Sequence, residues 1–530
     1  MFENEAKNKI FFPKDLKDFR IHFVGIKGTG MAALVEICVS RGAIVTGSDV
    51  PDHFYTDEIL KKLNIIPYTE FKKENITDDI KLVVYSSAYK LEENPELVEA
   101  TKKNIPCMLY SHALGNISAM SCSSGIAGVH GKTTTTGIAG TLVKALNLPA
   151  QVLAGSVIKS FSDNSTVNDF GSCTLSIGHK YFVAETCEYQ RHFMDFHPQN
   201  IILTSVESDH QDYYPTFENI QQAFIDYALL LPKNGNLIYC ADDIGATDTA
   251  EKIKKQRNDI NFIPYGFNAD GNFKILAHNI ESGLQNFKIK LFENEVFSIK
   301  VPGIHNVRNA TASIALMSIL FYQNNEVENF SELSMENKVE FVEKIKTGLL
   351  DFSGSKRRSE ILAHIKTDSN KQIIFIDDYG HHPTAIKTTL QGFKDFYPDK
   401  YLIVDFMSHT YSRTASLLDE FASSFTSADQ VILHKIYSSA RENKKDFEGV
   451  VSGQILFEKT KKYHENVVYF EEILDAKDYV KNIFSSPLPE GKNGFVFVTM
   501  GAGDNWKLGT SLIKDFNIWT AWQVIPIMKN

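Results

Sequence analysis

The stretch Gly128-Val129-His130-Gly131-Lys132-Thr133-Thr134-Thr135-Thr136 is a glycine-punctuated turn at the start of a predicted helix that continues to about Leu146. Such a turn directs consecutive backbone N–H groups and a helix N-terminus toward one small volume, which suits the phosphates of a nucleoside triphosphate. Lys132 is then placed beside the β- and γ-phosphates, and the Thr133 hydroxyl beside the magnesium ion that bridges them. We therefore expect an ATP-binding loop. An ordinary helix start is the alternative, because the spacing G-x-x-G-K-T matches only the second half of the common pattern.

Length and composition are those of a multidomain globular protein. A chain of 530 residues exceeds the size at which a single core keeps growing, so we expect about two to four domains. The net charge of -10 argues against nucleic acid or an anionic membrane as the main partner. The six cysteines contain no C-x-x-C pair, and no run of about 18 apolar residues is present. These features indicate a soluble, cytoplasmic protein without membrane insertion.

The N-terminal residues predict a second site of the nucleotide-binding kind. A strand at residues 21–24 leads into the turn Gly25-Ile26-Lys27-Gly28-Thr29-Gly30, a helix from Met31 to about Ser40, and a second strand that ends at Asp49. In such a βαβ unit the glycines let the backbone approach a diphosphate, and the acid can reach a ribose or sugar hydroxyl. A further strand at residues 82–85 ends in Ser86-Ser87. NAD, FAD and a nucleotide-sugar remain open as ligands, although the order G-x-x-G-x-G argues against a dinucleotide.

Two apolar runs in the middle of the chain end in candidate metal ligands. The predicted strand at residues 181–184 is followed by Glu185, and the one at residues 201–203 leads to His210. A carboxylate and an imidazole at neighbouring strand ends, beside a phosphate loop, would complete a divalent-metal site. Histidine is an unusual ligand for the hard Mg²⁺ ion, so a structural histidine and a surface acid are the alternative.

Six motifs, in the same order along the chain, resemble those of the Mur ligase family. They are the loop 128–136, the run that begins at Glu185, Glu207-Ser208-Asp209-His210-Gln211-Asp212, Gly303-Ile304-His305-Asn306-Val307-Arg308-Asn309-Ala310, Asp377-Asp378-Tyr379-Gly380-His381-His382-Pro383-Thr384 and His409-Thr410-Tyr411-Ser412-Arg413-Thr414. The resemblance covers about residues 18 to 515. It implies an α/β fold of three domains with mostly parallel sheets.

The resemblance also implies the domain order. Residues 1–118 form a Rossmann-like domain for a UDP-sugar, residues 119–345 a central P-loop ATPase, and residues 346–530 a Rossmann-like domain for an amino acid. The residues themselves support the last division, because 324–346 is rich in Asn and Glu, as expected at a domain junction. New strand-like runs then follow at 373–376, 401–404, 431–433 and 495–498.

The activity that the resemblance implies is an ATP-dependent ligation. L-alanine is joined to the lactyl carboxylate of UDP-N-acetylmuramate through an acyl phosphate, with ATP and Mg²⁺ required. The implied ATP contacts are Gly128, His130, Gly131, Lys132, Thr133, Thr134, Asn306, Arg358 and Asp378. The implied UDP-sugar contacts are Gly25, Gly28, Gly30, Met31, Asp49, Ser86 and Ser87. The amino acid is assigned to His381, His382 and Arg413, the metal to Thr133, Glu185 and His210, and catalysis to Lys132, Glu185 and His210.

Several positions bear on which amino acid is added. Branches of the family that act later carry a carbamylated lysine after the metal-binding histidine, and no lysine lies between Tyr214 and Leu231 here. Ala385 leans toward the recycling ligase that attaches a preformed tripeptide to the same UDP-sugar. The runs 408–414 and 436–442 resemble those of the branch that adds L-alanine. Because these are two longer matches against one substitution, they favour L-alanine as the substrate. Val129 stands where the family's loop usually has threonine.

Two other classes of protein remain possible interpretations of the sequence. A nicotinamide-dependent oxidoreductase would use the turn at 25–30 but would leave the phosphate loop unexplained. An assembly ATPase without ligase activity would use that loop but would leave the N-terminal turn idle. The tail 517–530 is rich in large apolar residues, and it either covers the core of its own domain or forms a contact in a homo-oligomer.

Overall fold

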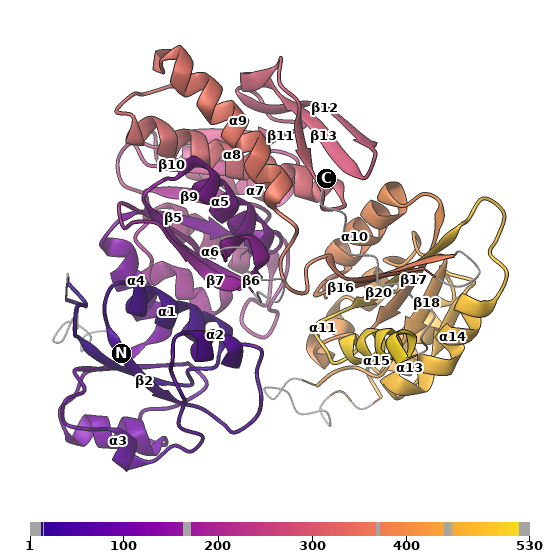
Figure 1. Cartoon of the computed structure of the whole chain (residues 1–530), viewed down its shortest axis with the longest axis horizontal. Helices are drawn as coiled ribbons and strands as arrows, with labels where there is room; N and C mark the ends of the chain where they lie inside the picture. The colour runs from indigo at the N-terminus through magenta and orange to yellow at the C-terminus, as the bar shows by residue number, and fades with distance from the viewer. Residues whose placement is uncertain are drawn as a thin grey trace.

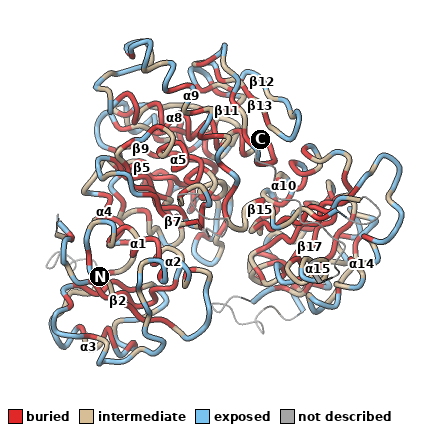
Figure 2. The backbone as a smooth tube through the Cα atoms, viewed as in Figure 1, coloured by how far each residue is buried: buried red, intermediate tan, exposed pale blue. Residues whose placement is uncertain are grey.

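The computed structural model describes residues 12–13, 15–162, 171–366, 371–438, 447 and 449–518. Over these residues the chain forms three α/β units, each built on its own β-sheet (Figure 1). In Figure 1 the N-terminal unit lies below the central unit, and the C-terminal unit stands beside both. Buried backbone runs through the middle of each unit in Figure 2, and exposed backbone is concentrated in the outer loops and helix faces. The predicted fold class, three α/β domains with mostly parallel sheets, is therefore confirmed.

The N-terminal sheet is parallel and has, in the described part of the chain, four strands in the order β2-β1-β3-β4. Its unit contains β1 (Arg20–Val24), α1 (Thr29–Ser40), β2 (Ile44–Ser48), α2 (Asp57–Lys62), β3 (Leu82–Tyr85), α3 (Pro95–Lys102), β4 (Cys107–Leu109) and α4 (Tyr110–Ala119). Val24 is in register with Ser48 on one side and with Tyr85 on the other. The glycine turn after β1, the acid after β2 and the serines after β3 consequently share one edge of this sheet.

Ten of the described strands form the central sheet, in the order β14-β13-β12-β11-β10-β9-β5-β8-β6-β7. They are β5 (Cys122–Ala127), β6 (Ala150–Ile158), β7 (Ser172–Ser176), β8 (Tyr181–Glu185), β9 (Asn200–Leu203), β10 (Asn236–Cys240), β11 (Asn261–Gly266), β12 (Phe273–Glu281), β13 (Leu284–Ile289) and β14 (Phe297–Ile299). The helices are α5 (Lys132–Leu146), α6 (Phe217–Ala228), α7 (Ile244–Lys254), α8 (Ile304–Asn324) and α9 (Met335–Asp351). Strands β8 and β9 lie on either side of β5 and run parallel to it. The segments that follow these three strands therefore meet at one edge.

The C-terminal sheet has six described strands in the order β15-β16-β20-β17-β18-β19. They are β15 (Glu360–Lys366), β16 (Gln372–Asp378), β17 (Lys400–Phe406), β18 (Gln430–Leu433), β19 (Val467–Tyr469) and β20 (Gly494–Met500). The helices are α10 (Pro383–Phe396), α11 (Tyr411–Ser416), α12 (Leu418–Ser423), α13 (Gly453–Thr460), α14 (Lys477–Ser485) and α15 (Trp506–Ile518). Strand β15 is antiparallel to β16, and the other neighbours are parallel.

The three units are joined in two different ways. One continuous apolar cluster extends from the N-terminal unit, with Phe23 and Leu34, into the central unit, with Phe193 and Tyr227. The C-terminal sheet has apolar clusters of its own on its two faces. Its described contacts with the central unit include polar ones, such as the pair of Arg413 with Asp209. Apolar burial thus unites the first two units, whereas hydrogen bonds and charges hold part of the boundary with the third.

Helix α9 bears on the predicted domain boundary. The expected division between residues 345 and 346 falls inside this helix, which spans Met335–Asp351. Buried residues of α9, including Phe341 and Ile345, belong to the apolar cluster of the central unit. Because a helix packed into one core belongs to that core, we propose that the central domain continues to the end of α9. The boundary at residues 118–119, at the end of α4, remains a prediction.

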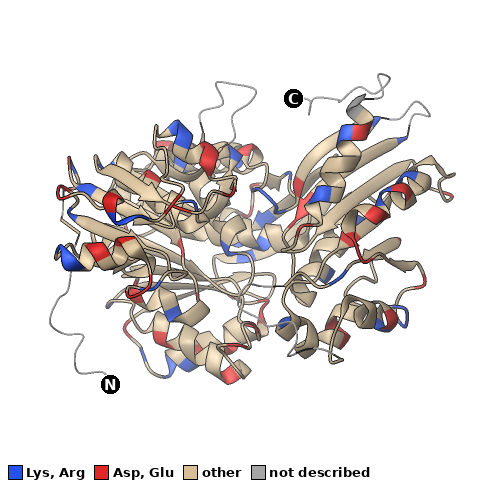
Figure 3. Cartoon of the chain, turned by 90° about the horizontal axis from the view of Figure 1, so that it is seen from below, with Lys and Arg blue, Asp and Glu red and all other residues tan. Residues whose placement is uncertain are grey.

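Two segments to which the sequence analysis gave a role lie wholly or partly outside the described residues. The tail 519–530, and positions 439–442 of the run 436–442, lie outside the described residues. In the described part of the chain, no helix combines the length and hydropathy needed to cross a bilayer. Acidic and basic segments are interspersed over the surface in Figure 3.

Candidate active site

The phosphate loop connects β5 to α5 and is held by the segment that follows β9. The N–H of Val129 donates to the carbonyl of Ser205 (3.1 Å), and the N–H of His130 donates to the Ser205 hydroxyl (2.9 Å). Gly128 has a φ of 133°, and a Cβ at this position would collide with Thr204. The N-cap of α5 is Gly131, and among the described residues no side chain caps this N-terminus. The first N–H groups of this helix therefore remain available to an anion.

Lys132 is held inside the site by a carboxylate that sequence reasoning did not assign. Its Nζ donates to the Gly128 carbonyl (2.6 Å) and to both oxygens of Glu188 (3.0 and 2.9 Å). Burial alone would lower the pKa of Lys132, but the charges of Glu188 and Glu185 outweigh burial and raise it. Burial would likewise raise the pKa of Glu188, but Lys132 and His210 outweigh it and lower that pKa. Both groups are therefore charged at neutral pH. The acid three positions after Glu185 was the available sequence signal.

The predicted metal residues form two separate pairs of contacts. The Thr133 hydroxyl donates to Glu185 Oε1 (3.1 Å), and the N–H of Gly155 donates to Glu185 Oε2 (2.9 Å). His210 Nε2 lies 3.4 Å from Glu188 Oε1, and Glu188 in turn is paired with Lys132. One hydroxyl and two carboxylates provide the oxygen ligands that Mg²⁺ prefers. The donor set present here therefore fits magnesium.

A pocket between the central and C-terminal units contains most of the predicted nucleotide residues. It is lined by His130, Gly131, Lys132, Thr133, Thr134, Glu185, Asn306, Arg358, Asp378, His381 and His382, among others. The described residues Gly128, His210 and Arg413 are outside this lining. Asp378 accepts N–H groups from Ser359 (2.7 Å) and Gly380 (2.7 Å), so it shapes the local backbone. Arg358 stacks over the Tyr379 ring at 5.0 Å. The tertiary fold thus brings together residues that are far apart in the sequence.

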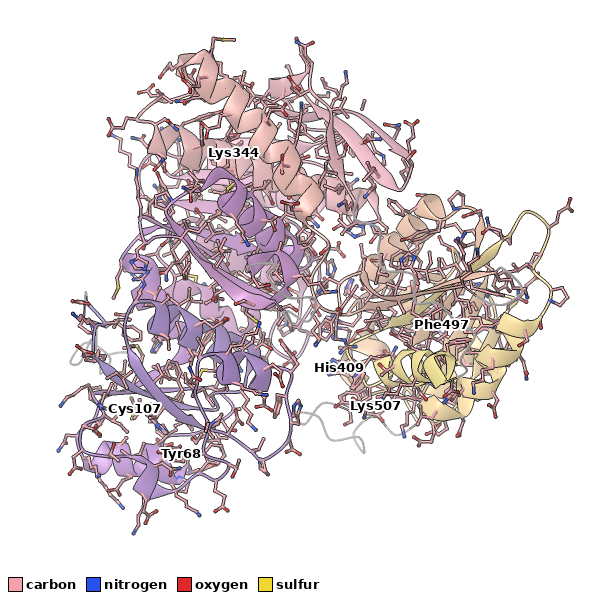
Figure 4. The ribbon with its side chains drawn as sticks, in the orientation of Figure 1. Tyr68, Cys107, Lys344, His409, Phe497 and Lys507 are labelled. Carbon is pink, nitrogen blue, oxygen red and sulfur yellow. The ribbon has the colours of Figure 1, made fainter. Side chains whose placement is uncertain are left out.

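An ion pair joins the two units close to this pocket. Arg413, from α11, donates to Asp209 Oδ1 through Nε (3.0 Å) and Nη2 (2.8 Å), and both side chains are buried. Burial would raise the pKa of Asp209, but the charge of Arg413 above all outweighs burial and holds this pKa well below its usual range. The predicted role of Arg413, binding the carboxylate of the amino acid, remains a prediction. The neighbouring residue His409 lies at the edge of the C-terminal unit that faces the other units (Figure 4).

The two predicted histidines precede α10 and lie near this ion pair; His382 is buried and His381 is partly exposed. Burial and the charge of Arg413 lower the pKa of His381 well below its ordinary value. Burial and the neighbouring His130 lower the pKa of His382 to about 4. His382 caps α10, because its Nδ1 accepts the N–H of Thr384 (3.4 Å). Both imidazoles are therefore neutral at neutral pH.

The predicted UDP-sugar residues lie together at the end of the N-terminal sheet. Gly25 has a φ of 86°, and a Cβ there would lie 2.7 Å from the Tyr89 ring. The Asp49 carboxylate accepts the N–H groups of Lys27 (2.7 Å) and Val50 (2.8 Å), so it also orders the turn. The remaining predicted residues surround this turn: Gly28 precedes α1, Gly30 and buried Met31 lie in its first turn, and Ser86 and Ser87 follow β3. Their predicted role in sugar binding remains a prediction.

A second, smaller pocket connects this unit with the central one. It is lined by Tyr110, Ser111, Leu114 and Gly115 of α4, and by Glu185, Thr186, Cys187, His192, Phe193 and Phe196 of the central unit. Tyr110 also closes on the glycine turn, since a Cβ on Gly30 would lie 2.9 Å from its ring. Glu185 borders both this pocket and the nucleotide pocket. A continuous path of residues therefore leads from the N-terminal turn to the phosphate loop.

Comparisons with known proteins point to one family. Residues 20–121 match the description "Mur ligase family, catalytic domain", residues 126–317 "Mur ligase middle domain" and residues 357–503 "Mur ligase, glutamate ligase domain". The chain is 46% identical over 505 residues to UDP-N-acetylmuramate--L-alanine ligase of Treponema pallidum (strain Nichols), with 95% of this chain and 98% of that protein covered. It is 38% identical over 493 residues to the protein of the same name from Borreliella burgdorferi, with 92% and 97% covered.

Solved structures share the fold at lower sequence identity. UDP-N-acetylmuramate-alanine ligase from Thermotoga maritima superposes with a TM-score of 0.69 at 22% identity, covering 94% of this chain and 99% of that chain. A murein peptide ligase from Psychrobacter arcticus superposes with a TM-score of 0.59, also at 22% identity, covering 94% and 98%. Since these likenesses extend over nearly the whole chain, the three-unit architecture is common to all of these proteins.

Proposed function

Because the chain belongs to the Mur ligase family, we propose that its two adjoining pockets carry out a single ATP-dependent ligation. The protein is an amide-forming ligase that joins L-alanine to the lactyl carboxylate of UDP-N-acetylmuramate, and it serves peptidoglycan synthesis. The names of the Treponema and Borreliella relatives state these two substrates. The N-terminal unit binds the UDP-sugar, the central unit binds ATP and the C-terminal unit brings the amino acid.

The position of Glu185 is the observation that carries this proposal. Glu185 borders the nucleotide pocket and also the smaller pocket between the N-terminal and central units. A sugar nucleotide held at the glycine turn can extend past Tyr110 and present its lactyl carboxylate at Glu185. ATP bound at the loop 128–136 presents its γ-phosphate from the other side. The two reacting groups then meet where the pockets join, as an in-line phosphoryl transfer requires.

The ligation proceeds in two steps that need positioning and charge neutralisation. A carboxylate oxygen of the lactyl group attacks the γ-phosphorus of ATP, ADP departs, and an acyl phosphate forms. The amine of L-alanine then attacks the acyl carbon, loses a proton and expels inorganic phosphate to give the amide. The partly buried, charged Lys132 and the uncapped N–H groups of α5 stabilise the negative charge that moves during the first step. Closure of the C-terminal unit would exclude water from the acyl phosphate.

Thr133, Glu185 and His210 would hold Mg²⁺, with Glu188 beside them. When bound, the ion neutralises phosphate charge and orients the phosphoryl group. Glu188 contacts both Lys132 and His210, so it fixes the position of these two side chains relative to each other. This contact assigns to Glu188 a positioning role in the ATP site.

Arg413, with His381 or His382 nearby, would hold the carboxylate of L-alanine. Its guanidinium is paired with Asp209, so a substrate carboxylate has to share it or displace that acid. The neutral histidines add hydrogen-bonding capacity without adding charge. We also propose that the protein works in the cytoplasm, because all six cysteines are free thiols and its substrate ATP is supplied there.

Phosphate release by the purified full chain tests this function. With ATP, Mg²⁺ and UDP-N-acetylmuramate present, we expect L-alanine to support much faster release than the L-alanyl-γ-D-glutamyl tripeptide does. Omitting either UDP-N-acetylmuramate or the amine should abolish the release. A preference for the tripeptide would identify a recycling ligase and leave the two-step mechanism intact. Phosphate release that needs neither substrate would contradict the ligase proposal itself.

A further inference from the structure

Two histidines and one glutamate form a cluster where the central unit meets the C-terminal unit. Among the described residues, His130, Glu207 and His382 each direct one potential ligand atom to a common region, and these atoms lie within 4.8 Å of one another. His130 belongs to the phosphate loop, Glu207 follows β9, and His382 immediately precedes α10. All three line the nucleotide pocket. The ligation described above assigns no task to Glu207.

The distances in this cluster are close to those of a metal site. His130 Nε2 and His382 Nδ1 each lie 3.8 Å from Glu207 Oε2, and the two imidazole centroids are 4.7 Å apart. His382 Nδ1 also accepts the N–H of Thr384 at 3.4 Å, a long hydrogen bond that a bound ion would replace. A tetrahedral zinc ion with bonds of about 2.0–2.1 Å separates its ligand atoms by roughly 3.4 Å. Each histidine–glutamate gap therefore has to shorten by only roughly 0.4 Å. Small side-chain rotations suffice, since His130 and Glu207 are both partly exposed.

The hydrogen bonding of the cluster is incomplete. Within the described part of the chain, His130 Nε2, the ring nitrogen that faces Glu207, is buried and has no hydrogen-bond partner. Buried ring nitrogens normally have one, so this nitrogen requires an explanation. Glu207 Oε2 accepts the Thr384 hydroxyl (2.8 Å), which fixes the carboxylate between the two rings. Arg413 is paired with Asp209 and therefore does not neutralise Glu207. The negative charge of Glu207 can then attract a metal ion.

We propose that His130, Glu207 and His382 bind a divalent transition-metal ion of the zinc class. Two imidazoles and one carboxylate suit such borderline ions, and three protein ligands leave a fourth position for water or a phosphate oxygen. The hard Mg²⁺ ion prefers the hydroxyl and carboxylate oxygens around Thr133 and Glu185, so the two sites differ in chemistry. Because the ligands come from both units, the ion fastens the C-terminal unit to the central unit at the nucleotide pocket.

Metal content of the intact protein is the direct test. The full chain is incubated with ZnCl₂ in the presence of excess Mg²⁺, dialysed, and analysed for zinc per chain. We expect one retained zinc, and we expect Co²⁺ in its place to give the visible absorption of a tetrahedral site. Glu207→Gln keeps the shape and the hydrogen bond from Thr384 but removes the ligand charge. It should weaken zinc binding by roughly tenfold or more, as should His130→Ala.

Two further variants separate this site from its neighbours. His381→Asn changes the adjacent histidine in the same pocket and should retain the zinc. His210→Ala changes a predicted magnesium ligand and should also retain it. Zinc should raise the Tm of the wild type and leave that of Glu207→Gln unchanged, because an ion that binds only the folded state stabilises it. The proposal is overturned if the wild type retains no zinc, if Glu207→Gln and His130→Ala retain it fully, or if only His210→Ala loses it.

Discussion

Replacing Glu188 by Gln is expected to weaken the enzyme through its effect on Lys132. The two side chains meet at 2.9 and 3.0 Å, and Glu188 is 2% exposed. At an effective dielectric constant of about 20, two unit charges at this distance attract each other by about 6 kcal/mol. The glutamine oxygen still accepts a hydrogen bond and Glu185 remains nearby, so only part of that attraction is lost. Lys132 makes two charged hydrogen bonds to Glu188, and a difference of about 1 kcal/mol between a charged and a neutral hydrogen bond gives a net loss of about 2 kcal/mol for the two.

This loss has two measurable consequences in a phosphate-release assay. A loss of about 2 kcal/mol in the placement of Lys132 lowers kcat/KM by roughly 30-fold. The second consequence is a change in how kcat/KM depends on pH. Glu188 helps to raise the pKa of Lys132, so Glu188→Gln lowers that pKa, and the protonated lysine is lost at a lower pH than in the wild type. The alkaline limb of the kcat/KM profile should therefore move to lower pH.

Two control variants make this prediction specific. Glu188→Asp keeps the charge and should retain more activity than Glu188→Gln, with a smaller shift of the alkaline limb. Glu251→Gln removes an exposed acid on α7 and should match the wild type in both measurements. If Glu188→Gln shows the wild-type kcat/KM and an unmoved alkaline limb, Glu188 does not control the charge of Lys132, and the reasoning is refuted.

Three further predictions concern the same region. Lys132→Ala should abolish turnover while the far-UV circular dichroism stays unchanged, and near-normal turnover would contradict the assignment of the phosphate loop. Glu185→Ala and His210→Ala should each raise the Mg²⁺ concentration needed for half-maximal activity, whereas an unaltered dependence in both variants would make these residues structural. Asp209→Ala leaves the Arg413 guanidinium buried without its partner and should destabilise the docked C-terminal unit by about 3–5 kcal/mol, detected as a lower denaturant midpoint than in the wild type. Asp209→Asn should lower the denaturant midpoint less than Asp209→Ala does. Equal midpoints for the wild type and both variants would mean that this ion pair does not hold the units together.

Sequence patterns predicted the regular elements well because those patterns are local. The strand predicted at residues 82–85 is β3, and the strands predicted at residues 21–24 and 181–184 differ from β1 and β8 by one residue at one end. The helix predicted after the phosphate loop ends at Leu146, as expected. Short apolar runs next to glycine or polar residues carry this information within a few positions. The junction 324–346 was harder to interpret, because its polar composition also suits the exposed face of α9, whose other face is buried in the central core.

For this protein, the sequence alone determined the positions of the strands, the phosphate loop and the glycine turn, and its motifs identified the family. Only the tertiary structure decided which side chains neutralise one another. Lys132 and Glu188 are 56 residues apart, Asp209 and Arg413 are 204 apart, and Glu207 and Thr384 are 177 apart. A propensity or a hydrophobic period acts over a few residues, whereas a pair of charges depends on where two segments far apart in the sequence come to lie. For that reason the spacing of Glu188, three residues after Glu185, did not by itself assign it to the site; the adjacent ends of β5 and β8 bring it to Lys132.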